Sequence, residues 1–327
     1  MRWLPAGSWA RVTSAEALWA AWCCYRRGKA RRLAVAEFDL EADRHIFQLH
    51  RDLEAGTFWP GPFHLSVIRD PKARLIAAPA MRDRILHQAL VSELAPWFEP
   101  GFSDQHYACK SGRGPRRAVL RHLREQRRYP FRLGLDIRRY FPSVDLARLC
   151  DILFRRLRDE RCRDLTRLLL EAGARVWQQP LAIEHFGLPT PGRGLAIGGY
   201  LSQWCGALYL DGLDHYVQRV LKPGGYLRYM DDFVLFDQDP DRLFKMKAQI
   251  VIWLTKERGL SLNPKRGKVL PTTSPVIFLG YRLSRAGISP SRKLRRRMGY
   301  RLRLAIARGR WTLMRSLQSY RGLLVGP

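Results

Sequence analysis

Residues 226–236 read YLRYMDDFVLF, and the rest of the chain is organised around this stretch. Residues that favour β-structure flank two adjacent aspartates, which predicts two short strands with residues 230–232 in or beside the turn. Asp231 and Asp232 would then lie at the tip of a β-hairpin. Two neighbouring carboxylates repel each other, and a buried sheet tolerates them only when a cation or a base neutralises them. The alternative is a solvated turn without a function, so the interpretation depends on whether a third carboxylate lies nearby.

A third carboxylate follows another predicted strand. Residues 131–137 (FRLGLDI) form an apolar run that presents Asp136 at its end, and a helix follows from about residue 146. Ser143 or Asp145 can cap this helix. The predicted order of strand, helix, helix, hairpin, helix and strand is typical of an α+β fold in which helices back an antiparallel sheet. In that fold Asp136 can lie beside Asp231, although an acid after a strand also occurs in simple turns.

The composition predicts a globular protein with a polyanionic partner. The chain has 327 residues, 46% of them hydrophobic, which is enough for a sizeable core and two or three subdomains. Lys and Arg number 58 against 29 Asp and Glu, so the formal charge is 58 − 29 = +29. No acidic residue follows Glu257. Nucleic acid is the usual partner of such a chain, although a ribosomal-type tail or a membrane-surface helix gives a similar pattern.

The cysteines and the apolar runs indicate the compartment. The six cysteines show no C-x-x-C pair and no Cys/His metal spacing, so we expect reduced thiols. No apolar run approaches the roughly 18 residues of a membrane span, and the N-terminus lacks a signal-peptide pattern. We therefore expect a cytoplasmic protein without a membrane partner.

The remaining patterns predict mainly helices. They are expected at residues 14–27 and 41–54, after Pro79, after the Gly-rich turn 111–114, over 201–222 and 240–259, and from 291 on. The last of these is basic and amphipathic, with apolar residues every four positions: Leu294, Met298, Leu302 and Ile306. Residues 63–78 predict a hairpin with Arg69, Lys72 and Arg74, and residues 276–283 (VIFLGYRL) predict one strand. Residues 187–199 predict a flexible loop.

Several of these motifs, taken in order, resemble those of reverse transcriptases. The resemblance is greatest to the bacterial and phage enzymes of diversity-generating retroelements. The motifs that carry it are PKARLI (71–76), MRDRILHQAL (81–90), FEPGF (98–102), YACKSGRGPRRAV (107–119), LGLDIRRYFPSVD (133–145), IGGYLSQ (197–203), YMDD (229–232) and FLGYRL (278–283). The resemblance covers about residues 12–320, with Ala196 in place of the proline that usually precedes IGGYLSQ.

The resemblance implies a right-hand polymerase with fingers, an RRM-like palm and a short helical thumb. We expect an N-terminal helical lead-in at residues 1–60, fingers at 61–130, a palm at 131–285 and a basic thumb at 286–327. The palm would include part of the fingers–palm loop near residues 165–195.

The resemblance also implies a metal site for nucleotidyl transfer. Asp136 and Asp231 would bridge two Mg²⁺ ions, for which Mn²⁺ can substitute, because these hard cations prefer oxygen ligands. Asp232 would assist, and the carbonyl of Ile137 would supplement the ion on the nucleotide side.

A second group of residues would contact the incoming nucleotide and the templating pair: Lys72, Arg74, Phe141, Ile197, Gly198 and Gln203. The two basic residues would hold the triphosphate, and the aromatic ring would exclude a 2′-hydroxyl. The other three belong to the IGGYLSQ loop at the templating base pair. Lys268 would donate a proton to pyrophosphate, with Lys265 as the alternative.

Three functions stay open at this stage. The first is an RNA-directed DNA polymerase that copies a template-repeat RNA into adenine-mutagenised cDNA, with dNTPs, an RNA–DNA duplex and a small helical accessory protein as partners. The second is a reverse transcriptase that serves phage defence with another RNA template. The third is an RNA-binding scaffold without catalysis, against which the three aspartates argue.

Overall fold

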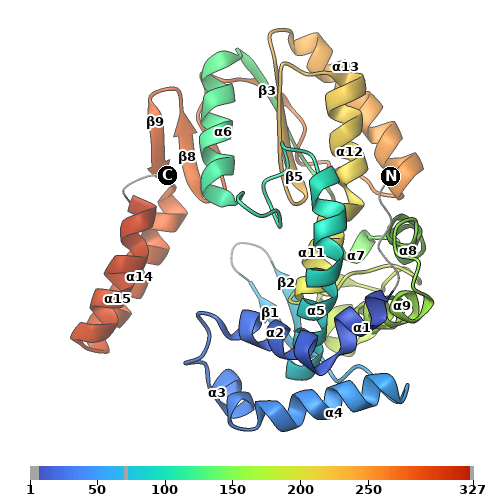
Figure 1. Cartoon of the computed structure of the whole chain (residues 1–327). Coiled ribbons are helices and arrows are strands. Elements are labelled where there is room, and N and C mark those ends of the chain that lie inside the picture. Colours follow the sequence, from blue (N-terminus) through green and yellow to red (C-terminus); the bar gives the residue numbers. More distant parts are fainter. Residues whose placement is uncertain (1–6, 70–72, 325–327) are drawn as a thin grey trace. The chain divides into compact units, whose positions relative to one another are not determined.

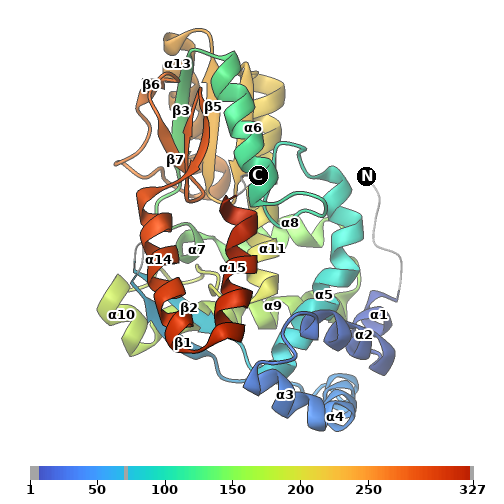
Figure 2. The same ribbon diagram turned by 90° about the vertical axis from the view of Figure 1, so that its left-hand side faces the viewer.

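Three antiparallel sheets and a larger set of helices make up the part of the chain that the structure describes. This computed structural model describes residues 7–69 and 73–324 (Figure 1, Figure 2). The described chain forms two units, each built from several stretches. Unit 1 consists of Met1–Phe102, Arg139–Asp211 and Thr255–Leu260, and unit 2 of Ser103–Arg138, Gly212–Leu254 and Ser261–Pro327. The predicted α+β class is confirmed, and the four-part division into lead-in, fingers, palm and thumb stays a prediction.

Unit 1 is largely helical. Its elements are α1 (Ser8–Thr13), α2 (Ala15–Arg26), α3 (Leu33–Leu40), α4 (Ala42–Glu54), β1 (His64–Ile68), β2 (Arg74–Ala78), α5 (Met81–Phe98), the 3₁₀ turn η1 (Glu99–Gly101), α7 (Tyr140–Ser143), α8 (Leu146–Phe154), α9 (Glu160–Arg175), the 3₁₀ turn η2 (Val176–Gln178), α10 (Pro180–Phe186) and α11 (Tyr200–Tyr209). Helix α5 lies at the centre, where it packs against α1, α2 and α11. The β1–β2 hairpin packs through Leu75 and Ala77 on Val176 and Trp177 of η2.

Unit 2 contains the two larger sheets. Its elements are α6 (Pro115–Arg128), β3 (Phe131–Asp136), α12 (Asp211–Tyr216, whose first residue belongs to unit 1), the π-turn η3 (Val217–Leu221), β4 (Gly225–Tyr229), β5 (Asp232–Asp237), α13 (Pro240–Trp253), β6 (Val269–Pro271), β7 (Val276–Phe278), β8 (Tyr281–Ser284), β9 (Gly287–Pro290), α14 (Arg292–Ala307) and α15 (Arg310–Leu324). The π-turn η4 (Leu254–Arg258) extends α13 across the boundary into unit 1. The strand order is β4-β5-β3-β6 in one sheet and β7-β8-β9 in the other.

Helices cover both faces of the four-stranded sheet of unit 2 (Figure 1). On one face Leu227, Val234 and Phe236 pack with α6 and with strands β7 and β8. Since neighbouring residues of a strand point to opposite faces, Arg228 lies on the other face, where it contacts Asp214 of α12. Helix α13 packs against β3, β5 and β6. The sheet is thus buried on both faces, as its apolar strands require.

Several predicted elements differ from the structure. The segment 276–283 is a hairpin of β7 and β8 rather than one strand, because Leu279 (φ 48°) and Gly280 (φ 88°) form a turn. The last strand of the four-stranded sheet is instead β6, which was not predicted. In α14, Ala305 is buried and Ile306 is exposed, contrary to the predicted face. The segment 165–195 contains α10 and most of α9, and its assignment to part of a fingers–palm loop stays a prediction.

Other predictions are confirmed. Helices α2, α4, α5 and α6, the hairpins β1–β2 and β4–β5, and the cap of α8 all occur where the sequence places them. Asp145 is that cap, since its carboxylate accepts a hydrogen bond from the Arg148 N–H at 3.1 Å. The helix expected over 201–222 is divided into α11, α12 and η3. In the described part of the chain, no helix combines the length and the apolar character needed to cross a membrane.

Candidate active site

The two adjacent aspartates lie at the turn of the β4–β5 hairpin. Tyr229 pairs with Asp232, so Met230 and Asp231 form a two-residue loop between the strands. Met230 has φ 56°, a left-handed conformation that is strained for a residue with a side chain. Both aspartates are half-buried, so their carboxylates stay within reach of solvent. The hairpin predicted from the sequence is therefore present, with Met230 and Asp231 in the turn and Asp232 beside it.

The third aspartate lies directly opposite this hairpin. Strands β3 and β5 are antiparallel, and their register pairs Asp136 with Asp232. Paired residues of an antiparallel sheet point to the same face and have Cα atoms roughly 4.5–5.5 Å apart. Beyond the last pair, the N–H of Ile137 donates a hydrogen bond to the carbonyl of Asp231 at 3.3 Å. The backbone thus places all three acids at one end of the sheet.

Residues 261–263 line the other side of Asp136. The side-chain amide of Asn263 donates to Oδ2 of Asp136 at 2.7 Å, and its backbone N–H donates to the Asp136 carbonyl at 2.8 Å. The next N–H, that of Arg138, donates to the carbonyl of Ser261 at 2.9 Å. The sequence does not predict a role for Asn263, because its only local signal is the turn-forming pair Asn263-Pro264.

The carboxylates suit a hard divalent cation. Within residues 7–69 and 73–324, no three His, Cys, Asp or Glu side chains gather closely enough to hold a metal alone. Mg²⁺ does not need such a cage, because it keeps several waters and binds through one or two carboxylates plus substrate phosphates. The cross-strand pair Asp136 and Asp232, with Asp231 beside it, fits this mode of binding.

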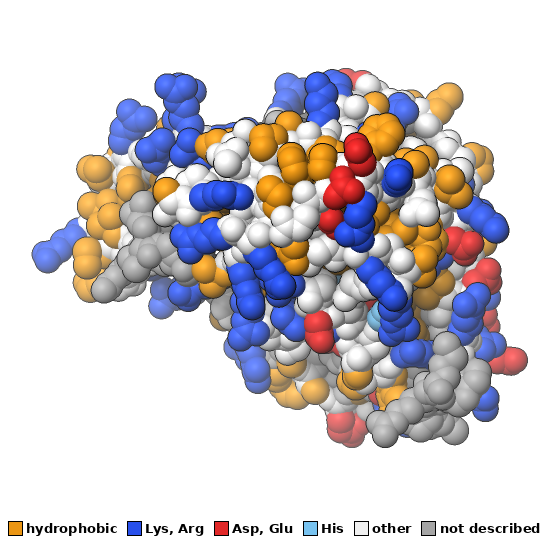
Figure 3. Space-filling model, turned by 90° about the horizontal axis from the view of Figure 1, so that it is seen from above, with side chains coloured by type: hydrophobic (Ala, Val, Ile, Leu, Met, Phe, Trp, Pro, Cys, Tyr) orange, Lys and Arg blue, Asp and Glu red, His pale blue; other side chains and the backbone are white. Residues whose placement is uncertain are grey.

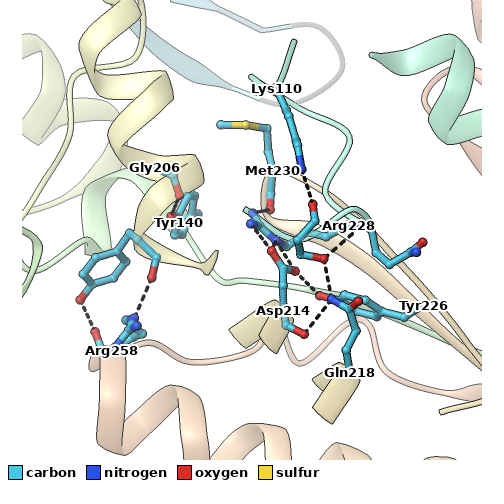
Figure 4. A network of polar contacts seen from close by, with 12 residues as sticks. Lys110, Tyr140, Gly206, Asp214, Gln218, Tyr226, Arg228, Met230 and Arg258 are labelled. Carbon is cyan, nitrogen blue, oxygen red and sulfur yellow. Dashed lines mark hydrogen bonds and ion pairs between the residues drawn. The ribbon is translucent and has the colours of Figure 1, made fainter. Parts of the chain in front are cut away.

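A buried ion pair lies behind the hairpin loop. The side chains of Arg228 and Asp214 are both fully buried, with Nη2 and Oδ2 2.6 Å apart (Figure 4). Tyr226 donates its hydroxyl to Oδ1 of Asp214 at 2.6 Å, and Nη1 of Arg228 donates to the Met230 carbonyl at 2.9 Å. The sequence carries one signal of this pair, because Arg228 interrupts an otherwise apolar strand two residues before the loop.

A further segment lies along β4. The N–H of Arg228 donates to the Gln105 carbonyl at 2.8 Å, and the N–H of Tyr107 donates to the Arg228 carbonyl at 2.9 Å.

Burial, followed by the charges of Arg228 and Lys110, holds the pKa of His106 well below its usual range, so this imidazole is neutral. Burial also raises the pKa of Tyr229, which keeps its phenol protonated beside the aspartates.

Unit 1 contains the IGGYLSQ loop and holds it against β2. The N–H of Ala77 donates to the Ile197 carbonyl at 2.7 Å. Gly198 has φ 141°, and a Cβ on it would lie 2.6 Å from the Ala77 carbonyl oxygen, so only glycine fits. Phe141 accepts a hydrogen bond on its carbonyl from the Leu195 N–H at 2.8 Å, and its ring packs near Gly206 of α11. These contacts bring the loop together with the hairpin that carries Arg74.

The predicted site residues are divided between the two units. Unit 2 holds Asp136, Ile137, Asp231, Asp232 and Lys268, whereas unit 1 holds Arg74, Phe141, Ile197, Gly198 and Gln203. Arg74, Gln203, Lys265 and Lys268 are exposed. Lys72 lies outside the described residues. The structure therefore brings together the three aspartates within unit 2, and β2 with the loop within unit 1.

The surface is strongly basic. On the face shown in Figure 3, Lys and Arg side chains are spread widely, whereas Asp and Glu occupy a few places. In α14 the exposed residues include Arg295, Arg296 and Arg297, while Leu294 and Met298 are buried. Since no acid follows Glu257, this part of the chain has no internal compensation for its positive charge.

Comparison with known proteins gives a family. The model of the family described as "Reverse transcriptase (RNA-dependent DNA polymerase)" matches residues 69–283, about two thirds of the chain. Similar proteins are the nuclear intron maturase 4, mitochondrial, of Arabidopsis thaliana (26% identical over 171 residues, 52% of this chain) and protein YkfC of Escherichia coli (25% over 286 residues, 72% of this chain). The chain covers 20% of the first of these proteins and 70% of the second.

The comparison with solved structures found telomerases. The apo telomerase of Candida tropicalis, truncated from its C-terminal domain, is 11% identical, with a TM-score of 0.46 over 74% of this chain and 59% of that one. The telomerase of Candida albicans, in complex with a fragment of telomeric RNA, is 12% identical, with a TM-score of 0.45 over 72% of this chain and 46% of that one.

Proposed function

The chain belongs to the reverse transcriptase family, and from this premise we propose that it catalyses RNA-directed DNA synthesis at the end of the β4–β5 hairpin. The observation that carries the proposal is the register that sets Asp136 opposite Asp232, with Asp231 in the adjoining loop. Three carboxylates at one end of a sheet suit a site that binds divalent cations, which prefer oxygen ligands. A non-catalytic RNA-binding scaffold does not require them.

In the proposed reaction, the 3′-hydroxyl of a primer attacks the α-phosphorus of a deoxynucleotide and pyrophosphate leaves. Two Mg²⁺ ions, held by Asp136, Asp231, Asp232 and the Ile137 carbonyl, would stabilise the attacking oxygen and the leaving group when bound. Asn263 would keep Oδ2 of Asp136 oriented through its amide. Lys268 would protonate the departing pyrophosphate, with the exposed Lys265 as the alternative.

The unit 1 residues are proposed to handle the incoming nucleotide. Lys72 and Arg74 would bind the triphosphate as cations, and Phe141 would exclude a 2′-hydroxyl by contact with the sugar. Ile197, Gly198 and Gln203 would border the templating base pair. The hydrogen bond between the Ala77 N–H and the Ile197 carbonyl supports this assignment, because it joins the strand of Arg74 to the loop.

A primer-extension assay tests the proposal. The purified chain, given Mg²⁺ or Mn²⁺, is expected to extend a DNA or RNA primer on an RNA template with deoxynucleotides. Asp231→Asn removes a metal ligand and should lower the rate by orders of magnitude. Asp241→Asn, the same substitution at an exposed position in the first turn of α13, is the control and should leave the rate unchanged. Equal extension by Asp231→Asn and the wild type would refute the assignment.

We further propose that the chain copies a template-repeat RNA with errors at template adenines, for targeted sequence diversification. Ile197 supports this role, because its aliphatic side chain cannot brace the nascent base pair with a hydrogen bond. Discrimination then depends on the fit of the pair, where a methylene-scale change is worth only about 1–3 kcal/mol. The preference for adenine, and a small helical accessory protein as partner, come from the resemblance to diversity-generating retroelements.

The diversification role has its own test. cDNA made in vitro from an RNA that holds all four bases in balanced contexts is sequenced, and errors should concentrate opposite adenine. Equal error rates at all four template bases would exclude this role and favour a phage-defence reverse transcriptase with the same chemistry.

A further inference from the structure

The buried ion pair of unit 2 has more hydrogen bonds than charge neutralisation requires. Nε of Arg228 lies 2.8 and 2.9 Å from the two oxygens of Asp214, and Nη2 lies 2.6 Å from Oδ2. With the hydroxyl of Tyr226 on Oδ1, the carboxylate accepts from two side chains. The carbonyl of Asp214 accepts a further bond from Gln218 at 3.0 Å. Asp214 thus fixes the plane of the guanidinium.

Stability alone does not explain this pair. Moving two charges out of water costs several kcal/mol per ion, and a well-packed apolar pair is often as stable as a buried ion pair. An Arg–Asp pair also has a directional property that apolar residues lack, because the guanidinium offers five N–H groups in a fixed fork. The contact that Arg228 makes besides those to Asp214 therefore indicates what the pair positions.

This further contact of Arg228 is with the loop of the β4–β5 hairpin. Nη1 of Arg228 donates to the Met230 carbonyl at 2.9 Å, which fixes the peptide between Met230 and Asp231 (Figure 4). The next peptide is fixed by the Ile137 N–H, which donates to the Asp231 carbonyl at 3.3 Å. Two successive peptides of the loop are thus held by groups outside it. Met230 needs such support, since its left-handed backbone costs on the order of 1–3 kcal/mol.

We propose that Arg228, oriented by Asp214 and Tyr226, is a positioning residue that sets the direction of the Asp231 and Asp232 carboxylates. Arg228 is fully buried and acts through the Met230 carbonyl. The inference rests on the proposed function for its catalytic consequence, although the anchoring of the loop is measurable without catalysis. Lysine cannot replace Arg228, because a single ammonium cannot reproduce the planar fork toward both the carboxylate and the carbonyl.

The chain offers a control at the far end of β5, the strand that pairs with the strand of Arg228. Arg242 and Asp237 form an ion pair with Nη1 and Oδ2 3.0 Å apart, and Asp237 is 2% exposed. The register pairs Asp237 with Phe131, five residue pairs away from the Asp136–Asp232 pair. Arg228→Lys and Arg242→Lys therefore make the same chemical change beside opposite ends of β5, and only the first is expected to affect the loop.

Hydrogen exchange tests the anchoring. In Arg228→Lys, the amide of Ile137 is expected to exchange at least about tenfold faster than in the wild type, because its acceptor carbonyl belongs to the released loop. In Arg242→Lys it should exchange at the wild-type rate. Unchanged exchange at Ile137 in Arg228→Lys would overturn the proposal.

Kinetics test the catalytic consequence. Arg228→Lys should lower kcat by roughly 10- to 100-fold, since small misplacements of reacting groups have effects of this size, with the KM for primer–template unchanged. The Mg²⁺ concentration for half-maximal rate should rise, whereas Arg242→Lys should keep the wild-type value. A kcat that falls only with the folded fraction would reduce Arg228 to a structural residue.

A milder variant covers the case in which Arg228→Lys does not fold. Tyr226→Phe removes one hydrogen bond to Asp214 and keeps both charges, so it should raise Ile137 exchange and lower kcat in the same direction, by less. Wild-type behaviour of this variant in both assays would also overturn the proposal. A different outcome is a wild type without polymerase activity, together with fast exchange of the Ile137 amide in Arg228→Lys. This outcome would refute the proposed function but support the anchoring of the loop by Arg228.

Discussion

The side-chain amide of Asn263 donates a hydrogen bond to Oδ2 of Asp136 at 2.7 Å, across 127 residues of sequence. The same asparagine accepts the Lys265 N–H on its own Oδ1 at 3.1 Å. Asn263 therefore links a turn of the chain to the carboxylate at the end of β3. One oxygen of Asp136 therefore has a fixed partner.

The first prediction concerns this amide. Asn263→Asp keeps the acceptor for the Lys265 N–H but turns the donor into a second carboxylate beside Asp136, and like charges disfavour ionisation of such a pair. We expect kcat for single-nucleotide extension to fall by roughly tenfold or more, because a misoriented group is costly in catalysis. Ser261→Ala is the control, since only the carbonyl of that exposed residue is used. Equal rates for Asn263→Asp and Ser261→Ala would contradict a role for the amide.

The second prediction concerns Gly198. Alanine there would bring its Cβ to 2.6 Å from the Ala77 carbonyl oxygen and displace the IGGYLSQ loop from β2, so the KM for deoxynucleotides should rise about tenfold. Gly192→Ala is the matched control, because Gly192 also has a positive φ (70°) but no atom within 4 Å of the added Cβ. It should cost only the backbone strain of about 1–2 kcal/mol. Steady-state kinetics and thermal unfolding of both variants distinguish clash from strain.

The third prediction concerns pH. Burial lowers the pKa of His122 from 6.5 to about 3 and that of His87 from 6.5 to about 4. The unfolded chain binds protons below pH 6.5 that the folded chain refuses, so the free energy of unfolding should fall as the pH drops from 6.5 toward these lower values. Each such histidine contributes about 1.4 kcal/mol per pH unit in this window.

Thermal unfolding at several pH values measures this effect. His122→Leu should reduce the loss of stability between pH 7.5 and pH 5. Phe278→Leu changes a ring 5.0 Å from His122 and loses packing without removing a titrating group, so it should lower stability by the same amount at both pH values. A His122→Leu variant with the full wild-type pH dependence would show that His122 is not a source of the acid sensitivity.

The fourth prediction concerns the basic helix α14. If Arg295 and Arg297 contact phosphates of the product duplex, their replacement by Ala should flatten the salt dependence of binding by about one unit for each lost contact. The control pair is Arg44 and Arg167, whose guanidinium groups already bind Glu41 and Asp164. Binding to an RNA–DNA duplex is measured from low to moderate salt. An identical slope for both double variants would leave the α14 arginines as solvated charges.

The local parts of the site were predictable from the sequence, and the distant contacts were not. The hairpin at residues 226–236 and the strand end at Asp136 have short-range signals, namely flanking β-formers and a following capped helix. The Asn263 contact and the Asp214–Arg228 pair join segments whose meeting depends on the whole fold, which no local period encodes. The sequence of β4 did indicate the Asp214–Arg228 pair in one respect, since an arginine inside an apolar strand needs a buried partner.

The wrong predictions for the segment 276–283 and for the buried face of α14 also have physical causes. Residues 276–283 contain only one glycine, and the turn also places Leu279 in a left-handed conformation that its side chain does not favour. The residue types around Leu279 therefore do not predict that turn. In α14 a repeat of exactly four residues drifts around a helix of 3.6 residues per turn, so the fourth apolar residue, Ile306, leaves the buried face and Ala305 replaces it.

The pairing of residues 105–107 with Arg228 also bears on how molecules of this protein meet one another. Strand β4 is one margin of the four-stranded sheet, and the backbone bonds of Arg228 to Gln105 and Tyr107 already occupy its outer side. The opposite margin, β6, has three residues and ends at Pro271, which lacks an N–H. Exposed strand margins recruit strands from other chains into aggregates, and short, covered or proline-containing margins prevent this. The sheet that carries the aspartates is therefore protected at both margins against edge-to-edge association.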